Sequence, residues 1–210
     1  MPMTPAAGDV LVVVDVQNDF LPGGSLAVAG GDEIIPLINA LAQRFTHVVL
    51  TQDWHPPGHI SFASSHPGRQ PFETIELPYG KQVLWPDHCV WETEGAALAD
   101  GLALPQAQLL IRKGYNQAVD SYSGFREADR RTRTGLAGYL RERGLERLFI
   151  AGLATDFCVG WTAIDAAAGG FATHVIEDAS RAIDTDGSLA RAWAQMAAAG
   201  VERITSADIA

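Results

Sequence analysis

The sequence predicts an α/β fold in which a parallel β-sheet carries helices on both of its faces. Six short runs are apolar at consecutive positions, which is typical of strands that are buried on both faces of a parallel sheet. Helical patterns fall between these runs, and several of them end at glycine. Strands that alternate with helices indicate crossover connections and therefore a three-layer α/β/α arrangement.

The six predicted strands are short and rich in valine, isoleucine and leucine. The first is the run VLVVV, and the others have the same character at intervals that leave room for a helix or a loop. In chain order they cover residues 10–14, 47–51, 108–112, 147–151, 173–177 and 201–205.

Four helices are predicted between these strands. The first covers residues 32–45, with Asp32 as its N-cap and Pro36 in the first turn, where a missing N–H costs little. The second starts from a Thr134 cap and stops at Gly144. The remaining two cover 156–170 and 187–200, and both end in glycine.

Length and composition predict one acidic domain over residues 1–210. The chain has 210 residues, 47% hydrophobic content and a formal net charge of −10, which suits one sizeable core. An acidic surface repels phosphate backbones and anionic lipid, so no nucleic-acid or membrane partner is expected. Two cysteines cannot form a disulfide framework, and we expect a cytoplasmic protein.

The segment at about 53–100 does not follow the strand–helix rhythm. It holds four of the six histidines, together with prolines at 56, 57, 67, 71, 78 and 86. Long irregular segments in compact domains are usually functional or disordered, and the aromatic and histidine content favours a functional, metal-binding segment.

Reactive side chains follow four of the predicted strands. Asp15 follows the first, Asp53 the second, Lys113 the third, and the loop leading to Cys158 follows the fourth. Ligands of open α/β sheets bind outside the carboxyl ends of the strands, so these groups are expected to share one rim.

Cys158 is the candidate nucleophile, although a lone cysteine at a helix start is more often a packed hydrophobe. A helix N-terminus and a nearby lysine both favour the thiolate, and Asp15 could accept the thiol proton. A carboxylate, an amine and a thiol together suit the cleavage of an acyl bond.

A metal site is predicted from the irregular segment. Asp53 and His55 share a face of an extended chain, His59 follows, and His88 lies behind a proline in WPDHCV. One carboxylate and two imidazoles suit Zn²⁺, Fe²⁺ or Mn²⁺, whereas the alternative is that the histidines are hydrogen-bonding loop residues.

Several blocks of the sequence together resemble the nicotinamidases of the isochorismatase-like cysteine hydrolase superfamily. These blocks are VVVDVQNDFLPGGSLAV, TQDWHPPGHISFASSH, WPDHCV, RKG, SYSGF and GLATDFCV, in family order. The resemblance implies a three-layer fold with a six-stranded parallel sheet.

The resemblance also implies a set of site residues. It assigns the catalytic triad to Asp15, Lys113 and Cys158, and the ligands of one divalent metal, zinc first and iron or manganese as alternatives, to Asp53, His55 and His88. It leaves His59 as a further candidate ligand. It implies an oxyanion hole from the backbone N–H groups of Ala154 and Cys158, and a cis peptide between Ala154 and Thr155. Phe20, Leu26, Trp85 and Tyr122 are candidate walls for the substrate, while Phe157 stands where some relatives have histidine.

The implied reaction converts nicotinamide to nicotinate and ammonia through a cysteine thioester, in NAD salvage, with pyrazinamide as a further substrate. Two alternatives stay open: a related metal-independent cysteine amidohydrolase that acts on another small amide, and a non-catalytic module with a structural metal. Assembly into a homo-oligomer also stays open.

Overall fold

The computed structural model describes residues 2–210 and contains a six-stranded, all-parallel sheet in the order β5-β2-β1-β6-β7-β8. The six strands are β1 (Asp9–Val14), β2 (His47–Asp53), β5 (Leu109–Lys113), β6 (Arg147–Leu153), β7 (Ala172–Arg181) and β8 (Glu202–Ile204). All six strands predicted from the sequence are therefore confirmed, with small shifts at their ends.

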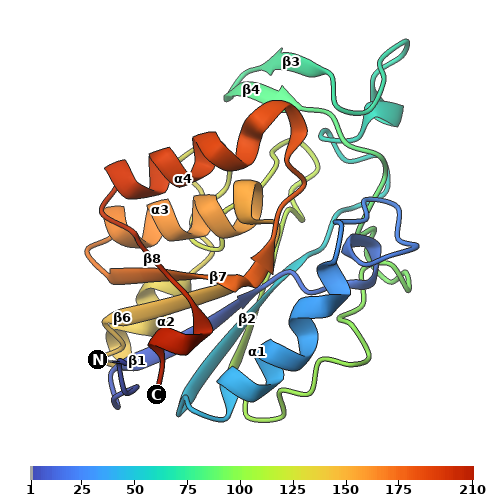
Figure 1. The fold of residues 1–210 in the computed structure, drawn as a ribbon. Helices are drawn as coiled ribbons and strands as arrows, with labels where there is room; N and C mark the ends of the chain where they lie inside the picture. The colour runs from blue at the N-terminus through green and yellow to red at the C-terminus, as the bar shows by residue number, and fades with distance from the viewer. Residues whose placement is uncertain (1) are drawn as a thin grey trace.

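Helices cover both faces of this sheet. They are α1 (Ile35–Ala42), α2 (Leu136–Glu142), α3 (Gly160–Ala168) and α4 (Ser188–Ala198). Helix α1 lies on one side, and α3 and α4 lie together on the other (Figure 1). Central strand β1 serves both cores, because Leu11 and Val13 pack with α1 whereas Val10, Val12 and Val14 pack with the helices of the opposite face.

The first helix starts later than the sequence predicts. A 3₁₀ turn, η2 (Gly31–Ile34), precedes α1, and its N-cap is Gly30 in the left-handed region with no side-chain cap. Asp32 thus lies inside the first turn, where its negative charge still interacts favourably with the positive end of the helix dipole. The N-cap of α2 is Gly135, one residue after the predicted Thr134, whose hydroxyl accepts a hydrogen bond from the Leu136 N–H at 3.2 Å.

The irregular segment contains a two-stranded antiparallel hairpin that the sequence reading missed. Its strands are β3 (Thr74–Leu77) and β4 (Gly80–Val83). They are short, and only Gln82 among their side chains is fully buried, so the apolar runs on which the other predictions depended are absent. The hairpin projects beyond the sheet, beside the start of α4 (Figure 1).

The chain order reverses between β1 and β6, which are neighbours at the centre of the sheet. Open α/β folds bind their ligands at such a switch point. Close approach of the two strands requires glycine at position 152, because a Cβ there would lie 2.1 Å from the Val14 carbonyl oxygen and its φ is +125°. The residues that follow β1 and β6, Asp15 and the loop to Cys158, therefore meet at this point.

Candidate active site and metal centre

Four adjacent strands deliver the buried polar groups of the site. Asp15 follows β1, Asp53 ends β2, and Lys113 ends β5; all three side chains are buried. Cys158 lies in η4 (Thr155–Val159), a single π-helical turn between β6 and α3. Because β5, β2, β1 and β6 are neighbours, the groups that sequence reasoning placed at separate strand ends form one cluster.

Lys113 is the centre of this cluster. Its Nζ lies 2.7 Å from Asp15 Oδ2 and 3.3 Å from Cys158 Sγ, and it also forms an ion pair with Asp53 and donates to the Ser121 carbonyl oxygen. One ammonium group thus faces two carboxylates and the thiol. Burial would lower the pKa of Lys113, but the two carboxylates outweigh it and hold the pKa well above its usual value, so the amine stays charged.

Asp15 is placed to exchange a proton with the thiol. Oxygen atoms of Asp15 and Asp53 and the sulfur of Cys158 all lie within 4.8 Å of one another. Thr51 donates a 2.6 Å hydrogen bond to Asp15 Oδ1. Asp15 Oδ2 pairs with Lys113 by distance, but no group among residues 2–210 makes an aligned hydrogen bond to it. That oxygen therefore keeps a lone pair for a proton.

Burial and the charge of Lys113 act on the pKa of the Cys158 thiol in opposite directions. Burial raises the pKa of Cys158 well above its usual value; Lys113 lowers it, and Asp15 and Asp53 raise it further. Burial likewise raises the pKa of Asp15, against the effect of Lys113. Loss of water thus opposes the effect of the lysine and favours the neutral thiol. Cys158 is thus a thiol at rest and needs a base.

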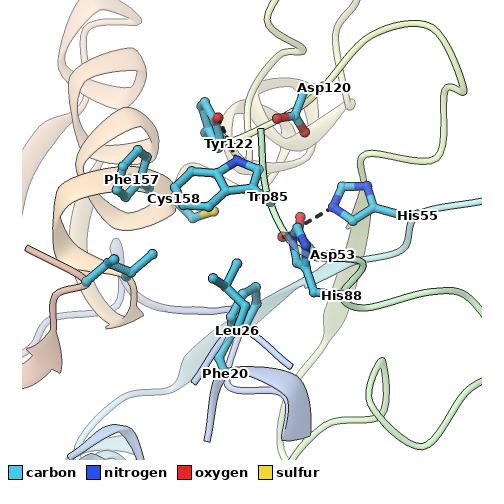
Figure 2. Close-up of a pocket in the computed structure, with 12 residues that line it drawn as sticks. Phe20, Leu26, Asp53, His55, Trp85, His88, Asp120, Tyr122, Phe157 and Cys158 are labelled. Atoms are coloured by element: carbon cyan, nitrogen blue, oxygen red, sulfur yellow. Dashed lines mark hydrogen bonds and ion pairs between the residues drawn. The ribbon is translucent and has the colours of Figure 1, made fainter. Parts of the chain in front are cut away.

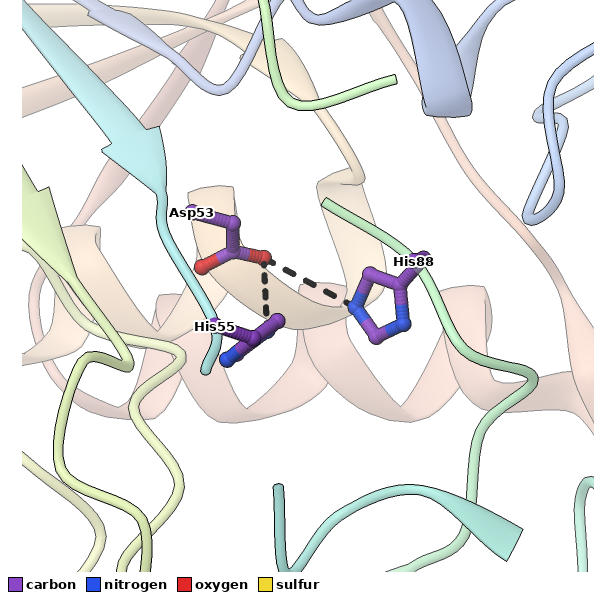
Figure 3. Close-up of side chains that lie close together, drawn as sticks. All are labelled: Asp53, His55 and His88. Atoms are coloured by element: carbon purple, nitrogen blue, oxygen red, sulfur yellow. Dashed lines mark ion pairs between the residues drawn. The ribbon is translucent and has the colours of Figure 1, made fainter. Parts of the chain in front are cut away.

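Asp53, His55 and His88 converge as a potential metal site (Figure 3). His55 Nε2 lies 3.7 Å and His88 Nε2 3.9 Å from Asp53 Oδ2, which is too long for hydrogen bonds and suits three ligands around one ion. The other ring nitrogens are occupied, because His55 Nδ1 pairs with the Gly114 carbonyl oxygen at 2.9 Å and His88 Nδ1 with that of Pro86 at 2.8 Å. Metal-binding histidines characteristically bond a carbonyl in this way, so these residues fit a divalent metal ion.

Electrostatics favour the metal-binding forms of Asp53 and His88, whereas the charge of Asp53 outweighs burial and raises the pKa of His55, so His55 must lose a proton to bind a metal. Burial and the charge of His55 lower the pKa of His88 to about 4, so its imidazole is neutral and its lone pair is available. Lys113 and His55 hold the pKa of Asp53 far below its usual range, despite burial, so the carboxylate is ionised. Gly114 is required beside His55, because a Cβ at that position would lie 2.4 Å from the imidazole Cε1 atom.

His59 lies next to this group but is turned to other partners. Its ring stacks on that of His55 with 4.3 Å between centroids. Its Nδ1 pairs with the Ser61 hydroxyl at 2.7 Å and its Nε2 with the Asn116 carbonyl oxygen at 3.0 Å. Both ring nitrogens are thus already engaged, although His59 also groups with His55 and Asp120 within 4.8 Å.

A cavity connects the thiol with the metal-site residues (Figure 2). All four predicted wall residues line it: Phe20, Leu26, Trp85 and Tyr122. The Trp85 indole N–H donates to the Tyr122 hydroxyl at 3.0 Å, which fixes the two rings at right angles. Ala154 also lines the cavity, near the thiol.

Sequence reasoning missed three lining residues: Asp120, Ile183 and, as a wall, Phe157. Asp120 is buried in the loop after β5, where Gln82 donates to its Oδ2 at 2.7 Å. Asp120 directly precedes the SYSGF block and lies seven residues after Lys113, and this position in the sequence could have indicated that it belongs to the site.

The implied position of the cis peptide was wrong by one residue. The cis bond joins Leu153 to Ala154 rather than Ala154 to Thr155. Leu153 is the last residue of β6, Ala154 has extended dihedral angles, and Thr155 already begins η4. The bond therefore lies where the strand ends, and the peptide on its other side belongs to the start of the turn.

The comparisons with known proteins agree with the fold. The Isochorismatase domain family matches residues 9–208. A curated relative, the nicotinamidase of Acinetobacter baylyi, is 61% identical over 99% of this chain and 97% of its own. Among solved structures, the Acinetobacter baumanii nicotinamidase/pyrazinamidase superposes with a TM-score of 0.96 at 60% identity, over 97% of this chain and 98% of that one.

Two further solved structures carry small ligands. A protein from L. infantum in complex with nicotinate has a TM-score of 0.87 and 40% identity, over 100% of this chain and 99% of that one. The pyrazinamidase of Pyrococcus horikoshii in complex with zinc has a TM-score of 0.77 and 36% identity, over 94% and 99% of the two chains. The six-stranded parallel sheet, its rim of reactive groups and the match over nearly the whole length lead to one conclusion: this chain belongs to the isochorismatase family.

Proposed function

We propose that this chain hydrolyses nicotinamide to nicotinate and ammonia through a thioester on Cys158, and that it also deamidates pyrazinamide. The observation that carries the proposal is the placement of Lys113 Nζ at 2.7 Å from Asp15 and 3.3 Å from the Cys158 sulfur, at the end of an aromatic-walled cavity. The activities of the nicotinamidase and pyrazinamidase relatives support this choice of substrates. We assign the reaction to NAD salvage.

In the first half of the reaction, Asp15 removes the Cys158 proton as the sulfur attacks the carboxamide carbon. The S–C bond forms as the carbonyl π electrons move to oxygen. The Lys113 ammonium stabilises the negative charge on Asp15 before the proton is transferred and on the sulfur as it attacks. The backbone N–H groups of Ala154 and Cys158 are the proposed donors to the oxyanion, each worth about 3–4 kcal/mol in comparable sites. Collapse breaks the C–N bond, and Asp15 returns the proton to the departing ammonia.

In the second half, a water molecule attacks the thioester. Asp15 takes one proton from that water, the C–S bond breaks, and the proton returns to sulfur, which restores the thiol; the product acid loses its remaining proton to solvent and leaves as nicotinate. The raised pKa of Asp15 makes its carboxylate a stronger base than an ordinary aspartate, which suits proton transfer from a thiol whose own pKa is raised. The cycle has two covalent stages and leaves the chain unchanged.

Asp53, His55 and His88 would hold a divalent metal ion, for which zinc is our first choice. When bound, such an ion supplies an electrophilic anchor for the ring nitrogen of the substrate. Within the chain, Asp53 links the two halves of the site, because one oxygen pairs with Lys113 and the other faces the imidazoles.

The cavity walls orient the flat ring. Phe20 and Leu26 come from the segment after β1, and Trp85 and Tyr122 from the loops after β4 and β5. Apolar walls remove water from the ring faces, and a ring held at both its nitrogen and its carboxamide presents the carbonyl carbon to the sulfur.

An ammonia assay on nicotinamide tests the proposal, with the enzyme as purified, after chelation, and after return of zinc, iron or manganese. We expect turnover as purified, a loss of turnover on chelation, and recovery with at least one metal. Turnover that is unaffected by a chelator shown to remove all bound metal would instead favour the metal-independent amidohydrolase, and no ammonia from nicotinamide in any state would refute the proposal.

A further inference from the structure

A second, larger hollow adjoins the reaction cavity. This outer cleft, of about 250 Å³, lies between the β3–β4 hairpin and the start of α4. Phe72 and Thr74 line it from the hairpin side, and Ser188 and Gln195 line it from α4. Trp85 and Phe157 line both the outer cleft and the reaction cavity, so these two rings separate one from the other.

The separating wall is a pair of perpendicular rings. The Trp85 and Phe157 centroids lie 4.8 Å apart at an interplanar angle of 87°. Trp85 is fixed on several sides: its indole N–H donates to Tyr122, its backbone N–H donates to the Ser61 carbonyl oxygen at 2.8 Å, and its carbonyl oxygen accepts from Ala63 at 2.8 Å. The backbone N–H of Phe157 donates to the Ala154 carbonyl oxygen at 3.0 Å, but its partly exposed ring has packing contacts alone, with Trp85 and Tyr122.

The remaining apolar walls do not open in this direction. Phe20 and Leu26 are buried and pack into the core that α1 covers. The Tyr122 hydroxyl accepts hydrogen bonds from both Trp85 and Gln82. Phe157 is therefore the wall residue whose truncation would join the cavity to the outer cleft without removing a hydrogen bond. It immediately precedes Cys158, so the opening would lie beside the thiol.

The chemistry of the substrate shows what this wall controls. In the function proposed above, the ring is held at its nitrogen and at the carboxamide carbon, positions 1 and 3. Positions 4, 5 and 6 then face the cavity walls, and any substituent there must fit the space between them. A methyl group that meets a closed apolar wall commonly costs a tenfold or greater loss of kcat/KM.

We propose that Phe157 is a specificity-determining residue: with Trp85 it closes the cavity toward the outer cleft and restricts the substrates to ring amides without substituents at positions 4 to 6. This inference rests on the proposed function. It assigns the outer cleft as space that substituted pyridine carboxamides would occupy once the Phe157 ring is removed.

The test compares kcat/KM for nicotinamide and for its 4-, 5- and 6-methyl derivatives, in the wild type and in Phe157→Ala. Dividing each derivative's value by that for nicotinamide, and then comparing variant with wild type, cancels the intrinsic reactivity of the amides. We expect kcat/KM of at least one derivative, relative to that of nicotinamide, to be about tenfold or more higher in Phe157→Ala than in the wild type. Phe157→Leu, which keeps an apolar side chain, should show a smaller rise and serves if the alanine variant does not fold.

A matched variant shows whether the outer cleft supplies the space. Thr74 is exposed on β3 and lines the outer cleft but not the reaction cavity, and tryptophan is tolerated in strands. Thr74→Trp alone should leave nicotinamide turnover unchanged, and in the Phe157→Ala background it should reverse the gain.

Two results would overturn the inference: a ratio that stays at the wild-type value for all three derivatives in both Phe157 variants, or a gain that persists when Thr74→Trp fills the outer cleft. The measurement on nicotinamide separates these failures from a failure of the proposed function, because in the latter the wild type would release no ammonia from nicotinamide.

Discussion

The thiol half and the metal half of the site meet at Asp53 but are built in different ways. Asp15, Lys113 and Cys158 come from the ends of sheet strands or the turn directly after one, and the parallel ladder fixes their spacing. His55 and His88 come from the irregular segment instead. There, single hydrogen bonds to the Gly114 and Pro86 carbonyl oxygens set the direction of each ring.

This difference suggests that the two halves respond differently to change. The sheet holds the thiol half in place, so substitutions there should mainly affect the rate of the reaction and, through the buried charges, the free energy of unfolding. Loops hold the metal half, so metal affinity should depend strongly on side chains that support the ligands without contacting the ion. Gln17 is the clearest of these: it is fully buried, its Nε2 donates to the Asp53 and Ala96 carbonyl oxygens, and its Oε1 accepts from the Asp53 N–H.

The largest effect is expected for Cys158→Ala. Removing the nucleophile should lower kcat for nicotinamide by at least about 10³-fold, since loss of a covalent nucleophile leaves binding and oxyanion stabilisation alone. Ammonia release measures the loss, and circular dichroism and zinc affinity should match the wild type because the metal half is built separately. Substantial residual turnover in this variant would refute the thioester scheme.

Lys113→Met should have the next largest effect, on stability. It leaves the buried carboxylates of Asp15 and Asp53 without their counter-charge, and breaking a buried ion pair in this way costs about 3–5 kcal/mol of unfolding free energy. Urea unfolding followed by circular dichroism measures the change. A loss below about 1 kcal/mol would mean that the buried cluster does not depend on the lysine charge.

Gln17→Leu should mainly affect the metal half. Removing the groups that hold both sides of the Asp53 peptide should weaken zinc binding by about tenfold or more, as loss of supporting contacts around a metal ligand does elsewhere. Competition with a chromophoric chelator measures the affinity. Gln108→Leu is the matched control, because that exposed side chain bonds the Thr46 carbonyl oxygen far from the site and should leave zinc affinity unchanged. Equal affinities in the two variants would contradict the role given to Gln17.

The smallest effect is expected at an exposed ion pair. It serves as the comparison for the buried ion pairs of Lys113. Arg203 pairs with Glu177 between β8 and β7, and both side chains are about half exposed. Arg203→Gln should cost no more than about 1 kcal/mol in the same urea experiment, because solvent screens the pair. A loss as large as that for Lys113→Met would show that burial does not distinguish the two ion pairs.

Site residues could be predicted from the sequence where they directly follow apolar strands. Asp15 and Lys113 could be placed at one rim because the apolar runs of β1 and β5 are visible in the sequence and parallel strands end together, although β1 is fully buried and β5 is a partly exposed edge strand. The hairpin β3–β4 left no such signal, since its side chains other than Gln82 are exposed or partly exposed, and the outer cleft beside it was not visible in the sequence for the same reason.

The sequence by itself determined the order of the strands, the residue types at the rim and the family resemblance, because these depend on patterns local in the chain. Tertiary structure alone decided three things: that the Cys158 thiol is neutral, that His59 turns to Ser61 and Asn116, and that Phe157 separates two hollows. Each depends on how completely neighbouring segments exclude water or supply a partner, and residues distant in sequence set those conditions.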